Sequence, residues 1–222
     1  QAVAKQADNN WQIDVNAEEA RGNVKLFNDW LRNGIDINAD FINLATINSP
    51  KDTQLTEVNV DILRKLPPLS FSCESCQILG KNLGEVKIIA SPIMTGMKLE
   101  EVSFKNSQGS LRTSGVWLFP TQLEVNSPND TGLAQYELAD VDKLNTAQKT
   151  ELGTTKLEGT LKSKDFGRFL NDFGLETGMR DSAADFDFAV SWDAAPYKFN
   201  FETLNGSVDW RLDDGYLTEI SD

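Results

Sequence analysis

Cys73 and Cys76 form a C-x-x-C motif, a spacing that suits zinc, redox or disulfide chemistry. A zinc site within the chain would need two more cysteine or histidine ligands, and the sequence contains neither. A redox centre of the thioredoxin type places its first cysteine at the start of a helix, whereas residues 69–72 are predicted to form a strand. Two alternatives stay open, a local disulfide formed in an oxidising compartment and two separate thiols, because strand residues three apart face opposite sides and bridge only across a turn. In either case we expect a structural role for the pair.

Asp185 and Asp187 are the local carboxylate pair best placed for general acid–base chemistry. On a strand they lie about 7 Å apart on one face, a separation found between glycosidase carboxylates, so a polysaccharide-active enzyme is one hypothesis. A general acid, however, needs a desolvated pocket, and both aspartates lie on the polar side of an amphipathic strand. The chain also has no histidine, which excludes Ser-His-Asp and Cys-His catalysis. We therefore predict no catalytic residue, no metal site and no cofactor.

Charge narrows the set of partners. The chain of 222 residues has 21 Lys and Arg against 34 Asp and Glu, a net charge of −13 that repels phosphate backbones and excludes nucleic acid as a partner.

No run reaches the ~18 apolar residues of a membrane-spanning helix, and residues 1–10 lack the apolar core of a signal peptide. The missing initiator Met and an end just after a predicted strand indicate a piece of a longer protein.

Alternation of apolar and polar residues is the main pattern of the chain. From residue 184 to residue 192, Ala, Phe, Phe, Val and Trp occupy one parity, and Asp, Asp, Ala and Ser the other. The same period returns at residues 155–162 and 204–212. This alternation is typical of half-buried strands in an antiparallel sheet with one solvated face. We predict an all-β fold, a curled antiparallel sheet that forms an elongated open hydrophobic groove.

Residues 1–222 are predicted to be a single fragment of a longer β-groove domain, with sub-blocks 11–69, 70–139 and 153–222. Prolines and Asx residues at 48–69 predict a connector with one helical turn near 60–65. Other turns are expected at 32–34 and, in the last hairpin, at 213–215. A loop or short exposed helix is expected at 140–152. Strands of the second block are expected near residues 70–76, 84–90, 99–105, 110–119 and 121–125.

One short helix is predicted near residues 165–173. Asp165 suits the N-cap, and Gly174 suits the position just after the helix end. About nine residues form no stable helix alone, so the apolar side chains must dock on the sheet or close one end of it. The side chains at helical spacing that we expect to close the groove are Phe166, Phe169, Leu170 and Phe173.

The apolar parity of the strands supports two interpretations. Its side chains form an ordinary core if two parts of the sheet pack as a sandwich. They line a groove if the sheet curls instead, because one sheet and one short helix supply little cover for so many amphipathic strands. The residues expected to line that groove are Trp11, Ile13, Val15, Ile37, Phe41, Phe71, Val86, Ile88, Trp117, Leu157, Leu161, Phe186, Phe188, Val190, Trp192, Val208 and Trp210.

Several stretches resemble the carboxy-terminal part of the YhdP family within the AsmA-like superfamily. They are TKLEGTL at 155–161, DFGRFLNDFG at 165–174, FDFAVSW at 186–192, LNGSV at 204–208 with Asp214-Gly215, GSLRTSGVW at 109–117, LPP at 66–68, and Cys73 and Cys76 leading to Leu83-Gly84. The likeness covers most of the chain and is thin before Trp11 and across 126–152.

This resemblance implies a large bacterial protein, anchored in the inner membrane by an amino-terminal helix outside this fragment. A long β-sheet groove then crosses the periplasm and carries lipids toward the outer membrane, and the family has no catalytic residues. The expected function is passive conduction of acyl chains, with a phospholipid or another envelope lipid as partner. The alternative is a structural or interaction β-sandwich of the cell envelope without lipid cargo.

Overall fold

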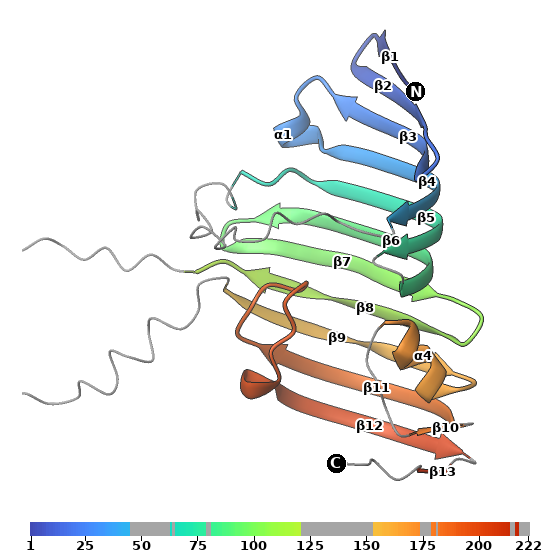
Figure 1. The fold of residues 1–222 in the computed structure, drawn as a ribbon. Coiled ribbons are helices and arrows are strands. Elements are labelled where there is room, and N and C mark those ends of the chain that lie inside the picture. Colours follow the sequence, from blue (N-terminus) through green and yellow to red (C-terminus); the bar gives the residue numbers. More distant parts are fainter. Residues whose placement is uncertain are drawn as a thin grey trace, which may run out of the picture.

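A computed structural model describes residues 1–44, 63, 65–78, 81–120, 153–173, 179–180, 182–213 and 216–217. The main element is one open sheet of eleven strands, stacked in the order β1-β2-β3-β4-β5-β6-β7-β8-β9-β11-β12 (Figure 1). Its strands are β1 (Ala2–Ala7), β2 (Asn10–Asn16), β3 (Ala20–Phe27), β4 (Ile35–Leu44), β5 (Leu69–Ile78), β6 (Lys81–Ile93), β7 (Gly96–Lys105), β8 (Gly109–Leu118), β9 (Thr154–Ser163), β11 (Ala183–Trp192) and β12 (Asn205–Asp213). The predicted curled sheet is confirmed, and β1 and β12 are its two edges.

One pair of neighbours departs from the predicted antiparallel pattern. β4 and β5 run parallel, with Ile35 beside Leu69 and Leu44 beside Ile78, whereas the other nine pairs of neighbours are antiparallel. A parallel pair cannot be joined by a tight turn and needs a long connection from the end of one strand to the start of the next. Residues 45–68 join the two strands along the chain, and most of the predicted connector at 48–69 lies outside the described residues.

A short helix, α1 (Trp30–Asn33), stands where the sequence predicted a turn at 32–34. The helix ends at Gly34, whose backbone N–H donates to the carbonyl of Trp30 and whose φ is +90°. A residue with a side chain rarely adopts this left-handed conformation, so glycine allows the chain to turn directly into β4.

The predicted helix near 165–173 is confirmed as α4 (Phe166–Asp172). The Asp165 side chain accepts a hydrogen bond of 3.0 Å from the backbone N–H of Arg168, which is the predicted N-cap. A 3-10 turn, η1 (Phe201–Thr203), precedes β12.

The prediction that the last two strands form a hairpin with each other is wrong. β13 (Tyr216–Leu217) pairs with β10 (Met179–Arg180) in a separate two-stranded sheet, and β12 pairs with β11. An Asp-Gly turn favours a hairpin locally, but it does not decide which strand the chain meets next. The predicted strand at 121–125, the loop at 140–152, most of the helical turn near 60–65, and Gly174 lie outside the described residues.

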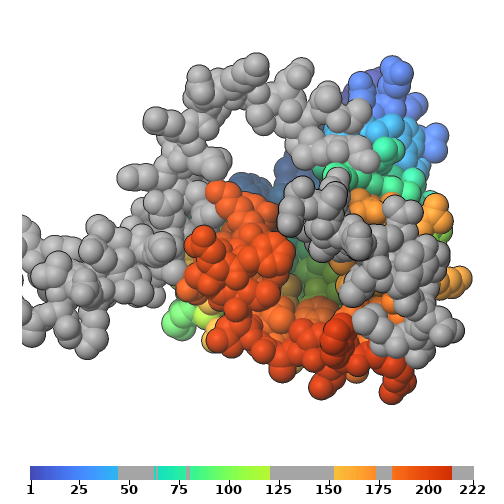
Figure 2. Space-filling model, turned by 60° about the horizontal axis from the view of Figure 1, so that its bottom comes forward, coloured from blue at the N-terminus to red at the C-terminus, as the bar shows by residue number. Residues whose placement is uncertain are grey.

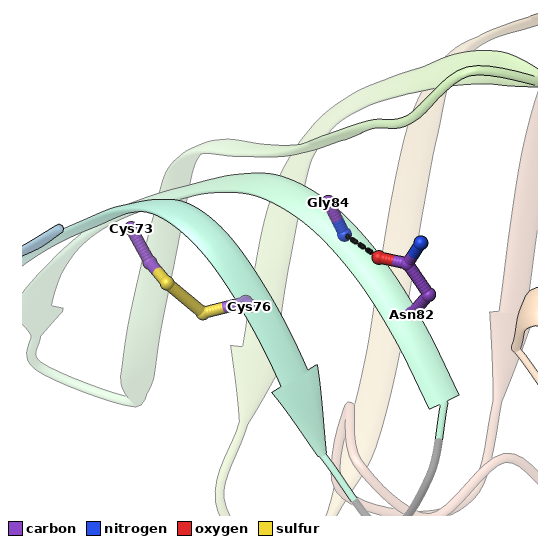
Figure 3. The surroundings of a disulfide bond; sticks show 4 residues. All are labelled: Cys73, Cys76, Asn82 and Gly84. Carbon is purple, nitrogen blue, oxygen red and sulfur yellow. Dashed lines mark hydrogen bonds between the residues drawn. A yellow bond between two sulfur atoms is a disulfide. The ribbon is translucent and has the colours of Figure 1, made fainter. Parts of the chain in front are cut away.

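Cys73 and Cys76 are joined by a disulfide, with their Cα atoms 5.9 Å apart (Figure 3). Cys73 pairs with Val86, and Cys76 pairs with Gly84, so three residues of β5 span the length of two residues of β6. This extra residue is a β-bulge, and it brings both sulfurs to the same face of the sheet. Between the two alternatives left open by the sequence, the structure shows the disulfide.

A second bulge, at Asp40, changes the predicted face of one residue. Gly22 pairs with Ala39, whereas Arg21 pairs with Phe41, so Asp40 is the extra residue. Phe41 therefore lies beside Arg21, whose guanidinium is 5.3 Å from the ring centroid, and Ile42 packs against the cluster of the two cysteines instead. The assignment of Phe41 to the groove lining was wrong, because simple alternation does not continue through a bulge.

Candidate functional site

One face of the sheet is apolar along its whole length. Directly paired residues share a face, and the pairings connect three rows of residues without interruption from β1 to β12. The first row is Gln6, Trp11, Leu26, Ile35, Leu69, Ala90, Leu99, Gly115, Leu157, Val190 and Gly206. The central row is Ala4, Ile13, Val24, Ile37, Phe71, Ile88, Val102, Thr113, Gly159, Phe188 and Val208. The third row is Ala2, Val15, Gly22, Ala39, Cys73, Val86, Phe104, Leu111, Leu161, Phe186 and Trp210.

We call these three rows the apolar face. Apart from the cysteine sulfur and the tryptophan indoles, only two of their side chains carry polar atoms, those of Gln6 and Thr113. Gln6 lies in the edge strand, and the Thr113 hydroxyl donates 2.7 Å to the backbone carbonyl of Glu158. The hydroxyl is thereby satisfied within the sheet. No charged side chain belongs to any of the three rows, so the apolar character is unbroken over all eleven strands.

The centre of the apolar face stays partly accessible among the residues that the structure describes. From Ile13 to Phe188, the side chains of the central row are half-buried, apart from Thr113, which is buried. Toward β12 the exposure increases, with Val208 at 51% and Trp210 at 64%. A closed core leaves such residues almost inaccessible, so this face is an exposed apolar surface of unusual length.

Two margins of the apolar face are covered. At one end of the strands, Ala90, Met97, Leu99 and Trp117 are buried in one cluster with Leu63 and Ala195, which come from the connections before β5 and after β11. The disulfide lies in a second buried cluster, with Ala39 and Val86, toward the other end.

The helix α4 covers the margin at that second end. Phe169 is 2% exposed, the Phe173 ring lies 5.4 Å from that of Phe104, and the Phe166 ring lies 4.8 Å from that of Phe186. Phe104 and Phe186 belong to the third row, so the helix packs on the apolar side of the sheet. Seen from the β12 end, this side is hollowed, with green strands at the back of the hollow and the red-orange segment after β11 beside it (Figure 2).

The opposite face is polar and charged. The middle row of this face, in which each residue pairs with the next one across the sheet, is Val3, Asp14, Asn23, Asn38, Ser72, Lys87, Ser103, Arg112, Thr160, Asp187 and Asp209. Glu101 bridges two cations on this face, 2.7 Å from Lys87 and 3.4 Å from Arg112. The hydrogen bond from Lys87, with the charges of Lys87 and Arg112, lowers the pKa of Glu101 below its ordinary value although desolvation opposes this shift.

The aspartate pair considered for acid–base chemistry lies on this polar face. Asp187 is exposed, and an Asp185 carboxylate oxygen lies 3.1 Å from the Lys162 ammonium. Neither carboxylate has the desolvated pocket that a general acid requires. Within the described residues, no group of three or more His, Cys, Asp and Glu side chains is arranged to hold a metal ion.

Apart from Phe41, the structure places the residues predicted to line a groove on the apolar side of the sheet. Fourteen of them belong to the three rows, and Trp117 and Trp192 continue that side toward the strand ends, each paired with Thr155. Val24 and Leu26 in β3 also belong to the rows and were not predicted, although both alternate with polar residues. Val102 and Phe104 were also missed, because the bulge between Leu99 and Val102 shifts their parity.

Comparisons with known proteins identify relatives of this chain. The sequence model of the family described as "YhdP protein" matches residues 1–222. A curated relative, "Intermembrane phospholipid transporter YhdP" of Escherichia coli (strain K12), is 33% identical over 67 residues, which are 30% of this chain and 5% of the relative. No solved structure matches the chain significantly. None of the described helices is long and apolar enough to cross a membrane.

Proposed function

This chain belongs to the YhdP protein family, and from that membership we propose that it is a periplasmic segment of an intermembrane phospholipid transporter. In this proposal the apolar face is the floor of a groove along which acyl chains move toward the outer membrane, and the polar face meets water. The anchor in the inner membrane belongs to another part of the longer protein. The segment performs no chemical reaction.

The observation that carries the proposal is the continuity of the apolar face. An ordinary sheet buries its apolar side against a second layer, but the second sheet among the described residues has only two short strands. The sandwich interpretation therefore does not fit the described part of the fold. An apolar strip that the described residues leave half-exposed from β2 to β11, apart from Thr113, fits a protein whose second layer is its ligand.

The dimensions suit lipid tails. At a strand spacing of about 4.8 Å, eleven strands span about 48 Å from β1 to β12, longer than one extended acyl chain. Each methylene that leaves water for such a surface contributes about 0.8 kcal/mol, so a chain of many methylenes binds without a cofactor. Because the rows present similar apolar side chains at every strand, a lipid can slide from one position to the next without a large change in free energy.

Native mass spectrometry of the purified chain tests the proposal. After incubation with vesicles of phosphatidylethanolamine and phosphatidylglycerol, we expect the protein to retain phospholipid masses. Ile88→Glu in the central row should remove them, and Ser103→Glu should not, because Ser103 lies on the polar face between Lys87 and Arg112. A protein that retains no lipid, or loses it equally in both variants, would support a scaffold without cargo.

A further inference from the structure

The connection from β11 to β12, Asp193–Leu204, presents an unusual set of exposed aromatic side chains. Tyr197 is 68% exposed, Phe199 49% and Phe201 70%. We call this segment the aromatic loop. Exposed rings gathered in one short connection indicate a binding surface, since single exposed apolar residues are common but clusters are not.

The backbone of the aromatic loop is held in place by buried and partly buried hydrogen bonds. The Thr155 hydroxyl donates 2.7 Å to the Ala194 carbonyl, and the Trp192 indole N–H lies 3.1 Å from the Lys198 carbonyl and 3.3 Å from that of Ala195. Ala195 is fully inaccessible. The exposed rings therefore project from a fixed base, which limits the entropy lost when they bind a ligand.

Ring contacts connect the aromatic loop to the apolar face. The Trp192 ring lies 5.0 Å from that of Phe199, which lies 4.6 Å from that of Phe201, and the Trp117 ring lies 6.0 Å from that of Tyr197. Trp117 and Trp192 are buried at the margin of the apolar face. A continuous series of rings thus leads from the covered margin out to water. The segment that carries these rings lies beside the hollow (Figure 2).

This position matches the boundary between the tails and the headgroup of a lipid. Tails that lie on the apolar face leave the glycerol and phosphate at its margin, where amphipathic rings such as tyrosine are favoured because one end is dry and the other is wet. Lys198, between Tyr197 and Phe199, is exposed and has no ion-pair partner among the described residues. A lysine at such a boundary packs its stem on apolar groups and presents its ammonium to water or phosphate.

Building on the proposed transport function, we propose that the aromatic loop is a phospholipid subsite for the glycerol–phosphate region. Tyr197, Phe199 and Phe201 contact the upper part of the tails and the glycerol, and Lys198 contacts the phosphate. Each lipid that passes β11 and β12 is held here with its headgroup at this edge of the groove. The apolar rows select for tails in general, whereas this loop selects for a phosphate attached to them.

Binding of two fluorescent probes tests the subsite, namely phosphatidylglycerol and diacylglycerol with the same labelled acyl chain. The double variant Phe199→Ser with Phe201→Ser should weaken phosphatidylglycerol binding about tenfold, an effect of the size expected for removing two partly desolvated rings. Met94→Ser is the control, because Met94 is 99% exposed in the turn between β6 and β7. Lys198→Ala should weaken binding of phosphatidylglycerol and leave that of diacylglycerol unchanged.

Three results would overturn the subsite. They are unchanged affinity in the double variant, an equal loss in Met94→Ser, and an equal effect of Lys198→Ala on both probes. Unchanged affinity would leave the transport proposal intact and assign the loop to a protein partner, whereas failure of the unaltered chain to bind either probe would refute both proposals. Thermal melting must be unchanged in every variant. If the double variant melts early, Tyr197→Ser, which removes a single ring, provides a second test.

Discussion

Phe188→Asp separates a lipid-binding surface from an ordinary core more sharply than other single changes in this chain. Phe188 lies in the central row, between Gly159 on β9 and Val208 on β12. Gly159 has no side chain, and Val208 is 51% exposed, so the Phe188 ring has open space around it. An aspartate at this position keeps contact with water when no lipid is bound.

The expected loss of stability is therefore small. Full burial of a Phe side chain contributes about 1.5–3 kcal/mol, and Phe188 is only half-buried, so the substitution should cost about 1–2 kcal/mol of the free energy of unfolding. In a closed core, the same change buries an unpaired charge and costs enough to unfold the chain.

The expected loss of lipid binding is large. An acyl chain lying on residue 188 would remove water from the new carboxylate, at a cost of several kcal/mol. Since about 1.4 kcal/mol corresponds to a factor of ten in affinity, binding should fall at least a hundredfold. The predicted signature is a nearly intact fold that has lost its lipid.

Circular dichroism melting and titration with a fluorescent phospholipid measure the two effects. Ala189→Asp is the matched control, because it adds the same charge at the next position on the polar face, and it should bind lipid normally. Collapse of the fold in Phe188→Asp, or undiminished binding, would refute the reasoning. Loss of function in Asp187→Ala alone would point to carboxylate chemistry instead.

Three further predictions concern the margins and the polar face. Replacing Cys73 and Cys76 by Ser should lower the melting temperature, because the closed loop constrains the unfolded chain, and should leave lipid affinity unchanged; reduced affinity at a temperature where the fold is intact would contradict a structural role. Phe169→Ala should destabilise the chain by about 3–5 kcal/mol in a urea titration, since the ring is 2% exposed, and an unchanged midpoint would show that α4 is dispensable. Glu101→Gln should cost at most about 1 kcal/mol at pH 7, because the pair with Lys87 is partly exposed. Because the pKa of Glu101 is lowered in the fold, its charge stabilises the fold above the ordinary pKa of the carboxyl group. The difference in the free energy of unfolding between Glu101→Gln and the unaltered chain should therefore vanish as the pH falls through the lowered pKa. A difference that persists in acid would contradict this cause.

Local patterns predicted much of the sheet. Alternation in 184–192 and 155–162 is uninterrupted, and the corresponding strands β11 and β9 pair in the register that sets Phe186 beside Leu161 and Val190 beside Leu157. The helix was predictable for the same reason, because Asp165 and the phenylalanine spacing are local signals.

The bulges and the parallel pair were not predictable from alternation. A bulge inserts one residue, so every later residue of the strand changes face, as Phe41 and Ile42 show. At Cys73 and Cys76, the same effect turned an apparent mismatch of faces into a disulfide. Strand order across β4 and β5 depends on contacts far apart in the sequence, for which a single sequence carries no local signal.

The exposed rings of the aromatic loop escaped the sequence analysis for a different reason. Tyr197 has no periodic context, and Phe199 and Phe201 share the two-residue spacing of a strand, which gives no signal of an exposed loop. The loop conformation instead depends on Trp192, whose indole binds carbonyls three and six residues ahead.

The central claim is that a single lipid path runs over the apolar face from β2 to β11. Site-specific photocrosslinking to phospholipid tests this claim most directly. A photoreactive residue is placed at neighbouring positions on three strands and exposed to vesicles of phosphatidylethanolamine and phosphatidylglycerol. The pairs, each with the central-row position first, are Ile13 and Asp14, Ile88 and Lys87, and Phe188 and Asp187. We predict lipid adducts at all three central-row positions and none at their polar neighbours. Adducts of equal yield on both faces, or at one of the three strands alone, would contradict a continuous path.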